Sequence, residues 1–251
     1  MKFSLAGFFP LSGLVPCSGL MNESVTMPTA VKVWDLPTRL FHWLLLASLC
    51  GSALSVFYFE NMTWHAYCGY ALLSLLLFRL VWGFTGGHWS RFASFIPSVQ
   101  RSLAYLRQPD NWQQPGHNPL AAWSVWSMLI VLFMQVASGL CADDDAGFSG
   151  PVSALVSNRT VELLTFYHAD IGKWILGLLI GLHLGAVLFH TFYKRQPLVR
   201  AMVSGYRLWR DRQVMFSTDN KLQRLKALGI FSLCAALVLA GVFFLEKAAS
   251  G

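Results

Sequence analysis

The sequence has little charge for its length. Asp, Glu, Lys and Arg make up 12% of its 251 residues, whereas a soluble domain carries about 25%. Four long stretches contain no charge at all, namely residues 40–59, 111–142, 174–193 and 227–245. Residues 61–90 contain a single one, Arg79. This depletion excludes an ordinary water-soluble shell and predicts segments within a lipid bilayer, where a helix needs about 20 apolar residues.

Cysteine and glycine do not occur in patterns that carry chemistry. None of the five cysteines forms a C-x-x-C pair, and the C-x-x-C-H signature of covalent c-type haem is absent. The nucleotide-binding fingerprint is also absent, which argues against direct NAD chemistry. Cys50, Cys68 and Cys234 fall within apolar stretches, so we interpret them as small apolar side chains.

The apolar stretches predict five transmembrane helices, near residues 38–59, 65–87, 119–141, 162–193 and 226–246. Helices are expected because every backbone amide in a bilayer must be paired internally. We therefore expect an all-α integral membrane protein in which four helices form an up-down bundle and a fifth follows at the C-terminus. Residues 1–30 are expected to be a poorly ordered extension, residues 31–213 the bundle domain and residues 214–251 the additional helix.

Two features refine the helix boundaries. Asp35 with Pro37, and Asn118 with Pro119, predict the starts of the first and third spans, because proline is favoured in the first turn of a helix. The basic segments 95–108 and 198–212 set arginine against apolar residues, which predicts two amphipathic helices along the inner membrane surface.

Positive charge is distributed unevenly among the loops. Lysine and arginine precede the first span and fill the loops between the second and third spans and between the fourth and fifth. The opposite loops contain Glu60, the acidic run 143–145 and Glu162, with little positive charge. Because positive loops stay cytoplasmic, we predict a membrane protein with its N-terminus on the cytoplasmic side and its C-terminus on the opposite side. The net charge of +7 is then a topology signal, and no nucleic acid is expected as a partner.

Five of the seven histidines lie in or at the ends of the predicted spans, namely His42, His65, His168, His183 and His190. Any one of them could be a hydrogen-bonded interfacial residue, but ionisable groups inside a membrane are functional by default. The alternating span directions place His65 and His168 toward the outer side, and His42 and His183 toward the inner side. The 15 residues between His168 and His183 correspond to about 22 Å along a straight helix and to about 60° around it.

Two imidazoles at one depth on facing helices are what an iron porphyrin takes as axial ligands. Filling both axial positions favours electron transfer over oxygen chemistry. Gly69 and Gly172 lie on the same helix faces as the histidines. Their lack of a side chain predicts the thin helix surface that a large flat cofactor needs. A separate stripe of glycines on the fourth span predicts close packing against another helix. The stripe consists of Gly177, Gly181 and Gly185.

Other chemistry fits the histidines less well. Zinc needs three or four nitrogen or sulfur ligands at one depth, but these histidines come in twos about 20 Å apart along a helix. A proton-relay transporter would carry more carboxylates inside the membrane. Arg79 lies 14 residues after His65, about 40° off the same face. It either extends to the membrane surface or pairs with a propionate of an inner haem.

Several segments, in order, closely resemble the bacterial di-haem cytochrome b561 family, which is related to the b subunit of membrane-bound nickel–iron hydrogenases. They are "VKVWDLPTRLFHWLL" (31–45), "WHAYCGYALLSLLLFRLVWGFTGGHWSRFASF" (64–95), "GHNPLAAWSVW" (116–126), "SGLCADDD" (138–145) and "GLHLGAVLFHTFYKRQPLVRAMVSG" (181–205). The resemblance covers roughly residues 31–210. The fifth span lies beyond the matched region, and we interpret it as a packing helix or as a docking site for a partner subunit.

This resemblance implies a four-helix membrane bundle that holds two b haems and exchanges electrons with quinone. By position it carries axial-ligand roles to His42, His65, His168 and His183. The family usually separates the two histidines of the fourth span by one residue fewer than here. His190 is an alternative to His183, but a His168-to-His190 separation of about 33 Å exceeds the hydrocarbon thickness, so His183 is predicted.

The leading hypothesis is a membrane-embedded carrier that transfers electrons across the bilayer between the quinone pool and a partner redox protein. The partner would be a soluble or membrane-anchored cytochrome or an oxidoreductase subunit, and the chain could itself act as a quinone oxidoreductase subunit. A second hypothesis is the anchor subunit of a hydrogenase or reductase complex. A third, from another class, is a haem-free membrane transporter or scaffold, which a visible spectrum would distinguish.

Overall fold

The computed structural model describes residues 29–109, 112, 114–209, 215 and 217–249. Within them, five helical segments are long and apolar enough to cross a membrane, which confirms the five predicted spans. They are α1 (Leu36–Phe57), α2 (Met62–Thr85), α4 (Pro119–Cys141), the continuous segment Asn158–Tyr193 and α8 (Lys221–Ala249). The predicted starts are also correct, because Asp35 and Asn118 cap α1 and α4 with their side chains.

The fourth span is one 36-residue helix that changes its winding twice. It runs through α5 (Asn158–Phe166), the π-helical segment η5 (Tyr167–Gly172), α6 (Lys173–Leu188) and a second π-helical segment, η6 (Phe189–Tyr193). A π-turn adds one residue to a turn of α-helix. Both π-helical segments contain one of the histidines singled out from the sequence, His168 and His190.

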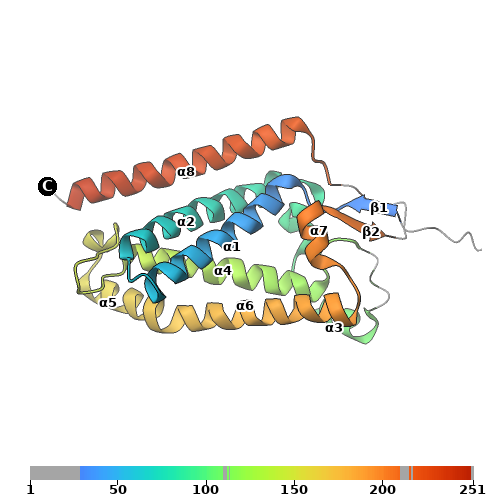
Figure 1. Ribbon diagram of the computed structural model, residues 1–251, viewed down its shortest axis with the longest axis horizontal. Coiled ribbons are helices and arrows are strands. Elements are labelled where there is room, and N and C mark those ends of the chain that lie inside the picture. The colour runs from blue at the N-terminus through green and yellow to red at the C-terminus, as the bar shows by residue number, and fades with distance from the viewer. Residues whose placement is uncertain (1–28, 110–111, 113, 210–214, 216, 250–251) are drawn as a thin grey trace, which may run out of the picture.

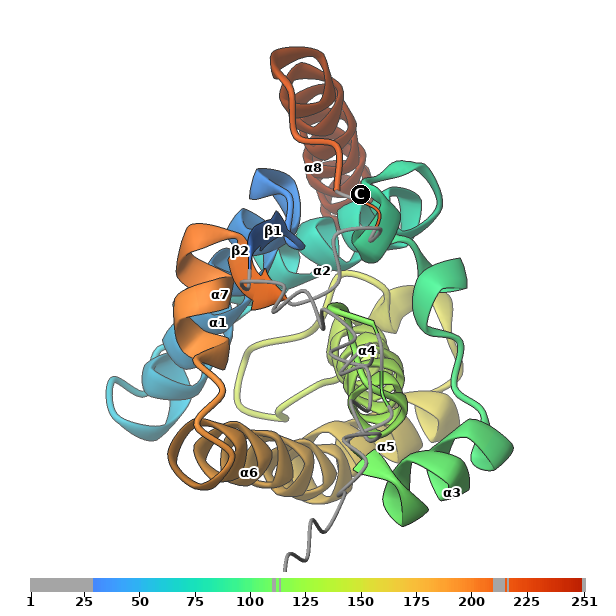
Figure 2. The same ribbon diagram turned by 90° about the vertical axis from the view of Figure 1, so that its right-hand side faces the viewer.

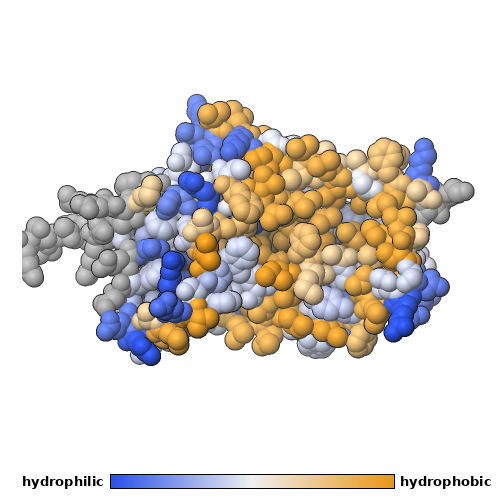
Figure 3. All heavy atoms as spheres, turned by 180° about the vertical axis from the view of Figure 1, so that it is seen from behind, coloured by the Kyte–Doolittle hydropathy of each residue, from blue (hydrophilic) through white to orange (hydrophobic). Residues whose placement is uncertain are grey.

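Helices α1, α2, α4 and α6 lie side by side as a bundle, and α8 stands on its outer side against α2 (Figures 1 and 2). The described chain begins at one end of the bundle and α8 ends at the other, as an odd number of spans requires. Figure 3 shows an apolar band across one face, with hydrophilic residues toward both ends. The chain is therefore a multi-pass membrane protein.

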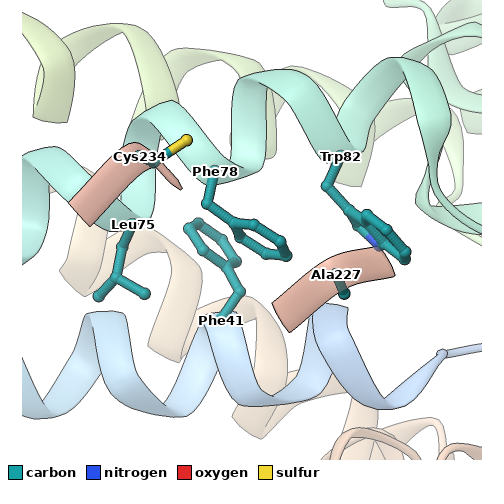
Figure 4. Packing of buried hydrophobic residues seen from close by; sticks show 6 residues of the cluster. All are labelled: Phe41, Leu75, Phe78, Trp82, Ala227 and Cys234. Carbon is teal, nitrogen blue, oxygen red and sulfur yellow. The ribbon is translucent and has the colours of Figure 1, made fainter. Parts of the chain in front are cut away.

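Two apolar clusters hold the helices together. The first joins α1, α2 and α8, and in Figure 4 Phe41 and Phe78 face each other next to Cys234. The second joins α2, α4 and α6. It consists of Leu72, Leu76, Leu132, Val136 and Leu176. The remaining large apolar side chains point outward over most of the surface, as lipid-facing residues do, so only a narrow seam of each helix packs against another.

Short elements close the end of the bundle at which the described chain begins. They are β1 (Thr29–Lys32), η1 (His88–Ser90), η2 (Phe92–Phe95), α3 (Val99–Arg107), α7 (Leu198–Ser204) and β2 (Tyr206–Trp209). A further 3-10 turn, η4 (Ser153–Leu155), lies in the loop after α4. The helix predicted over 95–108 is present as α3 but begins later, with Ser98 as its cap.

The helix predicted over 198–212 is wrong in its second half. Gly205 adopts a left-handed conformation (φ 86°) and ends α7, and β2 then pairs antiparallel with β1. The carbonyl of Gly205 accepts hydrogen bonds from the backbone amides of Val33 and Trp34 at 2.9 and 3.1 Å. Residues 210–212 lie outside the described residues. So do residues 1–28 of the predicted disordered extension, whereas Thr29 and Ala30 belong to β1.

Asp219 links this small sheet to the start of α8. Its fully buried carboxylate lies 2.7 Å from Lys32 Nζ and 2.8 Å from Arg224 Nε. The hydrogen bond from Arg224 and the contacts with Lys32 lower the pKa of Asp219 to about 2. Nearby, the backbone amide of Ser217 donates to the carbonyl of Lys32 at 3.0 Å. The fifth helix is therefore attached to the bundle through polar contacts at one end, besides its apolar seam.

Candidate functional site

The structure brings His65 and His168, the predicted outer pair, next to each other inside the bundle. His65 lies on α2 and His168 on η5, and their ring centroids are 5.8 Å apart at an interplanar angle of 83°. Both side chains are half-buried. The two imidazoles are thus close enough to bind one group between them.

Both histidines of the outer pair hydrogen-bond through Nδ1. His168 Nδ1 lies 2.8 Å from the carbonyl oxygen of Gln135, and His65 Nδ1 lies 3.1 Å from that of Ser52. The hydroxyls of Ser52 and Ser138 also approach these nitrogens, at 3.0 and 3.4 Å, and a hydroxyl can either donate or accept. A carbonyl only accepts, so a proton on each Nδ1 satisfies both contacts of each ring and leaves each Nε2 its lone pair. Metal-ligating histidines almost always donate their second ring N–H in this way. The outer pair therefore has the protonation of two axial ligands.

A cavity of about 420 Å³ contains this pair. Its walls are mainly apolar side chains of α1, α2, α4 and α6, completed by Phe148 and Pro151 from the loop after α4. Gly69 lines it as well, and among the described residues no atom outside its own stretch of helix lies within 4 Å of where its Cβ would be. Cofactor pockets span about 300–1,000 Å³ and are apolar with a few placed polar groups. The residues present thus fit a haem held by His65 and His168.

The π-helical segment η5 accounts for the spacing of the two histidines on the fourth span. His168 lies in η5 and His183 in α6. Because a π-turn accommodates one extra residue, their 15-residue separation covers about the same number of turns as a separation shorter by one residue in a straight helix. The 60° offset expected from a straight helix is correspondingly changed. The extra residue between His168 and His183 is therefore accommodated within η5, and both histidines can face the bundle interior.

The predicted inner pair does not make a ring contact like that of the outer pair among the described residues. His42 on α1 and His183 on α6 are near enough for an electrostatic interaction only. The Nδ1 atom of His42 is buried and has no hydrogen-bond partner among the described residues. An unpaired buried imidazole nitrogen is costly and fits a position where a bound group completes the site. His190, in η6, has a buried Nδ1 without a described partner too.

Arg79 is buried, with 4% of its surface exposed, so it does not extend to the membrane surface. Its guanidinium donates to the carbonyl of Ser90 at 2.9 Å and lies 4.8 Å from the ring centroid of Phe92. The hydroxyl of Ser90 in turn donates to the buried carboxylate of Asp35 at 2.9 Å. Arg79 therefore belongs to a polar network at the end of the bundle where β1 and β2 lie.

His117 is a site residue that the sequence reasoning missed, because it was assigned to a loop. Its ring lies 4.7 Å from that of Trp34 and 4.6 Å from that of Phe95, and its Nδ1 is buried without a described partner. Burial, together with Arg79 and then His183, lowers the pKa of His117 to about 3. Arg79 and His183 are thus both near enough to His117 to interact with it electrostatically. The sequence did contain one indication that His117 lies at the end of the bundle, namely its position directly before Asn118, the predicted start of the third span.

The glycines behave differently from expectation. Gly177, Gly181 and Gly185 are exposed and have no atom within 4 Å of a built Cβ, so within the described residues this stripe does not pack against another helix. Gly172, in contrast, makes a close approach, since a Cβ there would lie 1.9 Å from Gln135 Oε1. The thin surface predicted at Gly172 therefore accommodates the side chain of Gln135.

Comparison with known proteins identifies relatives across the bundle. The profile of the family described as "Prokaryotic cytochrome b561" matches residues 33–205. A probable Ni/Fe-hydrogenase B-type cytochrome subunit from Azotobacter vinelandii is 26% identical over 229 residues, which cover 75% of this chain and 93% of the relative. The corresponding proteins from Bradyrhizobium diazoefficiens and Escherichia coli K12 are 27% and 21% identical, covering 75% and 70% of this chain and 90% and 89% of theirs. No solved structure matches significantly.

Proposed function

Since the chain belongs to the prokaryotic cytochrome b561 family and is a membrane-embedded b-type cytochrome of electron transfer, we propose that it holds two b haems. The outer haem is ligated by His65 and His168 and the inner haem by His42 and His183. The observation that carries the proposal is the hydrogen bond from each Nδ1 of the outer pair to a backbone carbonyl, which leaves two Nε2 lone pairs beside an apolar cavity.

In this proposal the bound haems supply one-electron chemistry, and the protein binds and orients them. His65 and His168 would hold one haem between them and would leave no position for oxygen, so this haem would supply electron transfer only. Arg79 is a buried cation, and both Arg79 and His183 are near enough to His117 for an electrostatic interaction. Arg79 is suited to pair with a haem propionate, which would replace part of its interaction with the Ser90 carbonyl.

The proposed electron path crosses the bilayer between quinone and a partner redox protein. The relatives are named as B-type cytochrome subunits of Ni/Fe-hydrogenases, so we propose a hydrogenase or a related oxidoreductase as the partner, with this chain as its quinone-side membrane subunit. Positive charge gathers at the end of the bundle that contains α3 and α7, which supports a bacterial inner-membrane location with a cytoplasmic N-terminus.

We further propose that residues 31–213 form the di-haem unit and residues 214–251 an additional helix. The family match ends at residue 205, and α8 packs on the outer side of α2 (Figure 2). Removing α8 would expose the apolar side chains of α1 and α2 that it covers, among them Phe41 and Phe78. A role in covering that seam, or in docking a partner subunit, is consistent with its mostly exposed surface.

Haem stoichiometry tests the proposal. Purified protein should give a b-type visible spectrum and about two non-covalent haems per chain in a pyridine haemochrome assay. His65→Ala should retain one haem, and a matched exposed substitution on the same helix, Tyr67→Phe, should retain both. One haem in the wild type would mean that one pair is only structural. A protein without any haem would instead support the transporter or scaffold alternative.

A further inference from the structure

Gln135 is a polar side chain on an otherwise apolar stretch of α4, and it contacts the same histidine twice. Its side-chain amide Nε2 donates to the backbone carbonyl of His168 at 2.9 Å. Its own backbone carbonyl accepts from His168 Nδ1 at 2.8 Å. Gln135 also lines the cavity of the outer pair. A polar group in lipid-buried protein needs a reason, since leaving it unpaired is costly.

The carbonyl of His168 lies in the π-helical segment η5. In a regular α-helix this carbonyl would accept from the amide four residues later, whereas π-helical winding shifts that bond to the amide five residues later. A carbonyl oxygen has a second lone pair, and the side-chain amide of Gln135 donates to this carbonyl. The glutamine thus ties α4 to the irregular turn that contains His168.

Gly172 makes the approach of Gln135 possible. It is buried in η5, and any Cβ at this position would lie 1.9 Å from Gln135 Oε1. Even alanine would therefore push the glutamine side chain away from the helix that carries His168. Three features of two helices, namely the π-turn, the glycine and the glutamine, thus converge on the orientation of one imidazole.

We propose that Gln135 is a positioning residue for the outer haem. Its side chain anchors the backbone of His168, and its carbonyl fixes the Nδ1 proton, so that Nε2 of His168 faces His65 across the cavity. This inference rests on the proposed function, because it assumes that the outer pair binds haem. A strong Nδ1–H···O=C bond raises the basicity of a ligating imidazole and so favours the oxidised iron. Gln135 therefore keeps the midpoint potential of the outer haem low.

If Gln135 had a purely structural role, substituting it would lower the stability of the protein without changing the midpoint potential or EPR signal of one haem alone. The test is an anaerobic redox titration with low-temperature EPR on Gln135→Met, which keeps the side-chain length and loses the donor. Met134→Leu is the matched control, because Met134 is adjacent on α4 and faces outward. Titrations in a His42→Ala background, which retains only the outer haem, assign the two potentials.

Gln135→Met keeps the backbone carbonyl that accepts from His168 Nδ1 but loses the side-chain bond that anchors His168, so the Nδ1–carbonyl bond should loosen. The variant should keep two haems, raise the midpoint potential of the outer haem and shift its low-spin EPR signal, while the inner haem titrates as in the wild type. Gly172→Ala should change the same haem in the same direction, which provides a second route if Gln135→Met folds poorly. Unchanged potentials and EPR signals in both variants, or an equal shift of both haems, would overturn the inference alone. A wild type without the outer haem would overturn the proposed function and this inference with it.

Discussion

The imidazole rings of His65 and His168 lie 5.8 Å apart, although 103 residues of sequence separate them. Each ring is oriented by a carbonyl of a third or fourth element, Ser52 on α1 and Gln135 on α4. Four segments of the chain thus contribute to a single pair of nitrogens. This arrangement explains how the orientation of the two imidazoles can be fixed although each helix by itself is almost entirely apolar.

The π-turn in η5 gives a prediction about a deletion. Removing Ile171 should convert η5 to regular α-helix and leave both His168 and His183 facing the bundle, because the π-turn already absorbs one residue. We expect this variant to retain two haems. Inserting one alanine after Leu178, in regular α6, should instead rotate one histidine by about 100° and remove one haem. Haem quantification measures both, and loss of a haem on deletion of Ile171 would contradict the π-turn explanation.

Arg79 gives a prediction about the inner haem. Arg79→Leu removes a buried cation that, in the proposed function, pairs with a propionate of the inner haem. The reduced haem then loses stabilisation, so its midpoint potential should fall. The outer haem should be unaffected. Arg79→Lys, which keeps the charge, should shift the potential less. If redox titration shows both potentials unchanged in Arg79→Leu, the residue serves only to hold the Ser90 carbonyl.

His183 and His190 can be distinguished directly. His183→Ala should abolish the low-spin EPR signal of one haem, because it is the predicted inner ligand. His190→Ala should retain both signals, with at most a change in potential. Both residues are half-buried on the same long helix, so the two variants are matched in position and in the volume removed. The reverse outcome would transfer the ligand role to His190.

Asp219 gives a prediction about stability and pH. Its pKa is about 2 in the folded protein and about 3.9 for an unperturbed Asp. A lowered pKa stabilises the folded state above pH 4, and this contribution is lost as the pH falls from about 4 toward 2. Asp219→Asn should therefore unfold more easily at neutral pH, by roughly 1–3 kcal/mol.

The measurement for Asp219 is thermal unfolding in detergent across this pH range. The difference between wild type and Asp219→Asn should shrink as the pH approaches 2, since the wild-type carboxylate is then protonated as well. Thr218→Ser is a suitable control on the same segment. A difference that stays constant with pH would show that the contacts of Asp219 with Lys32 and Arg224 do not stabilise the protein through charge.

The sequence by itself determined the architecture of the spans. A bilayer imposes a local requirement, about 20 apolar residues with internally bonded backbone, and runs such as 227–245 satisfy it visibly. Helix starts at Asp35 and Asn118 were predictable for the same reason, because capping depends on neighbouring residues only. The depth of each histidine followed from its position along a span, which is why the two pairs could be named before the fold was known.

Tertiary structure decided which side chains complete those pairs. The strand at 206–209 was predicted as helix because its partner, 29–32, lies far away in sequence. The π-turn at His168 arises where an extra residue must fit a helix that is already fixed at both ends by its neighbours, and no local propensity encodes it. Gln135 became significant only when α4 met η5. Such contacts depend on packing between distant segments, whereas sequence periodicity reports on one helix at a time.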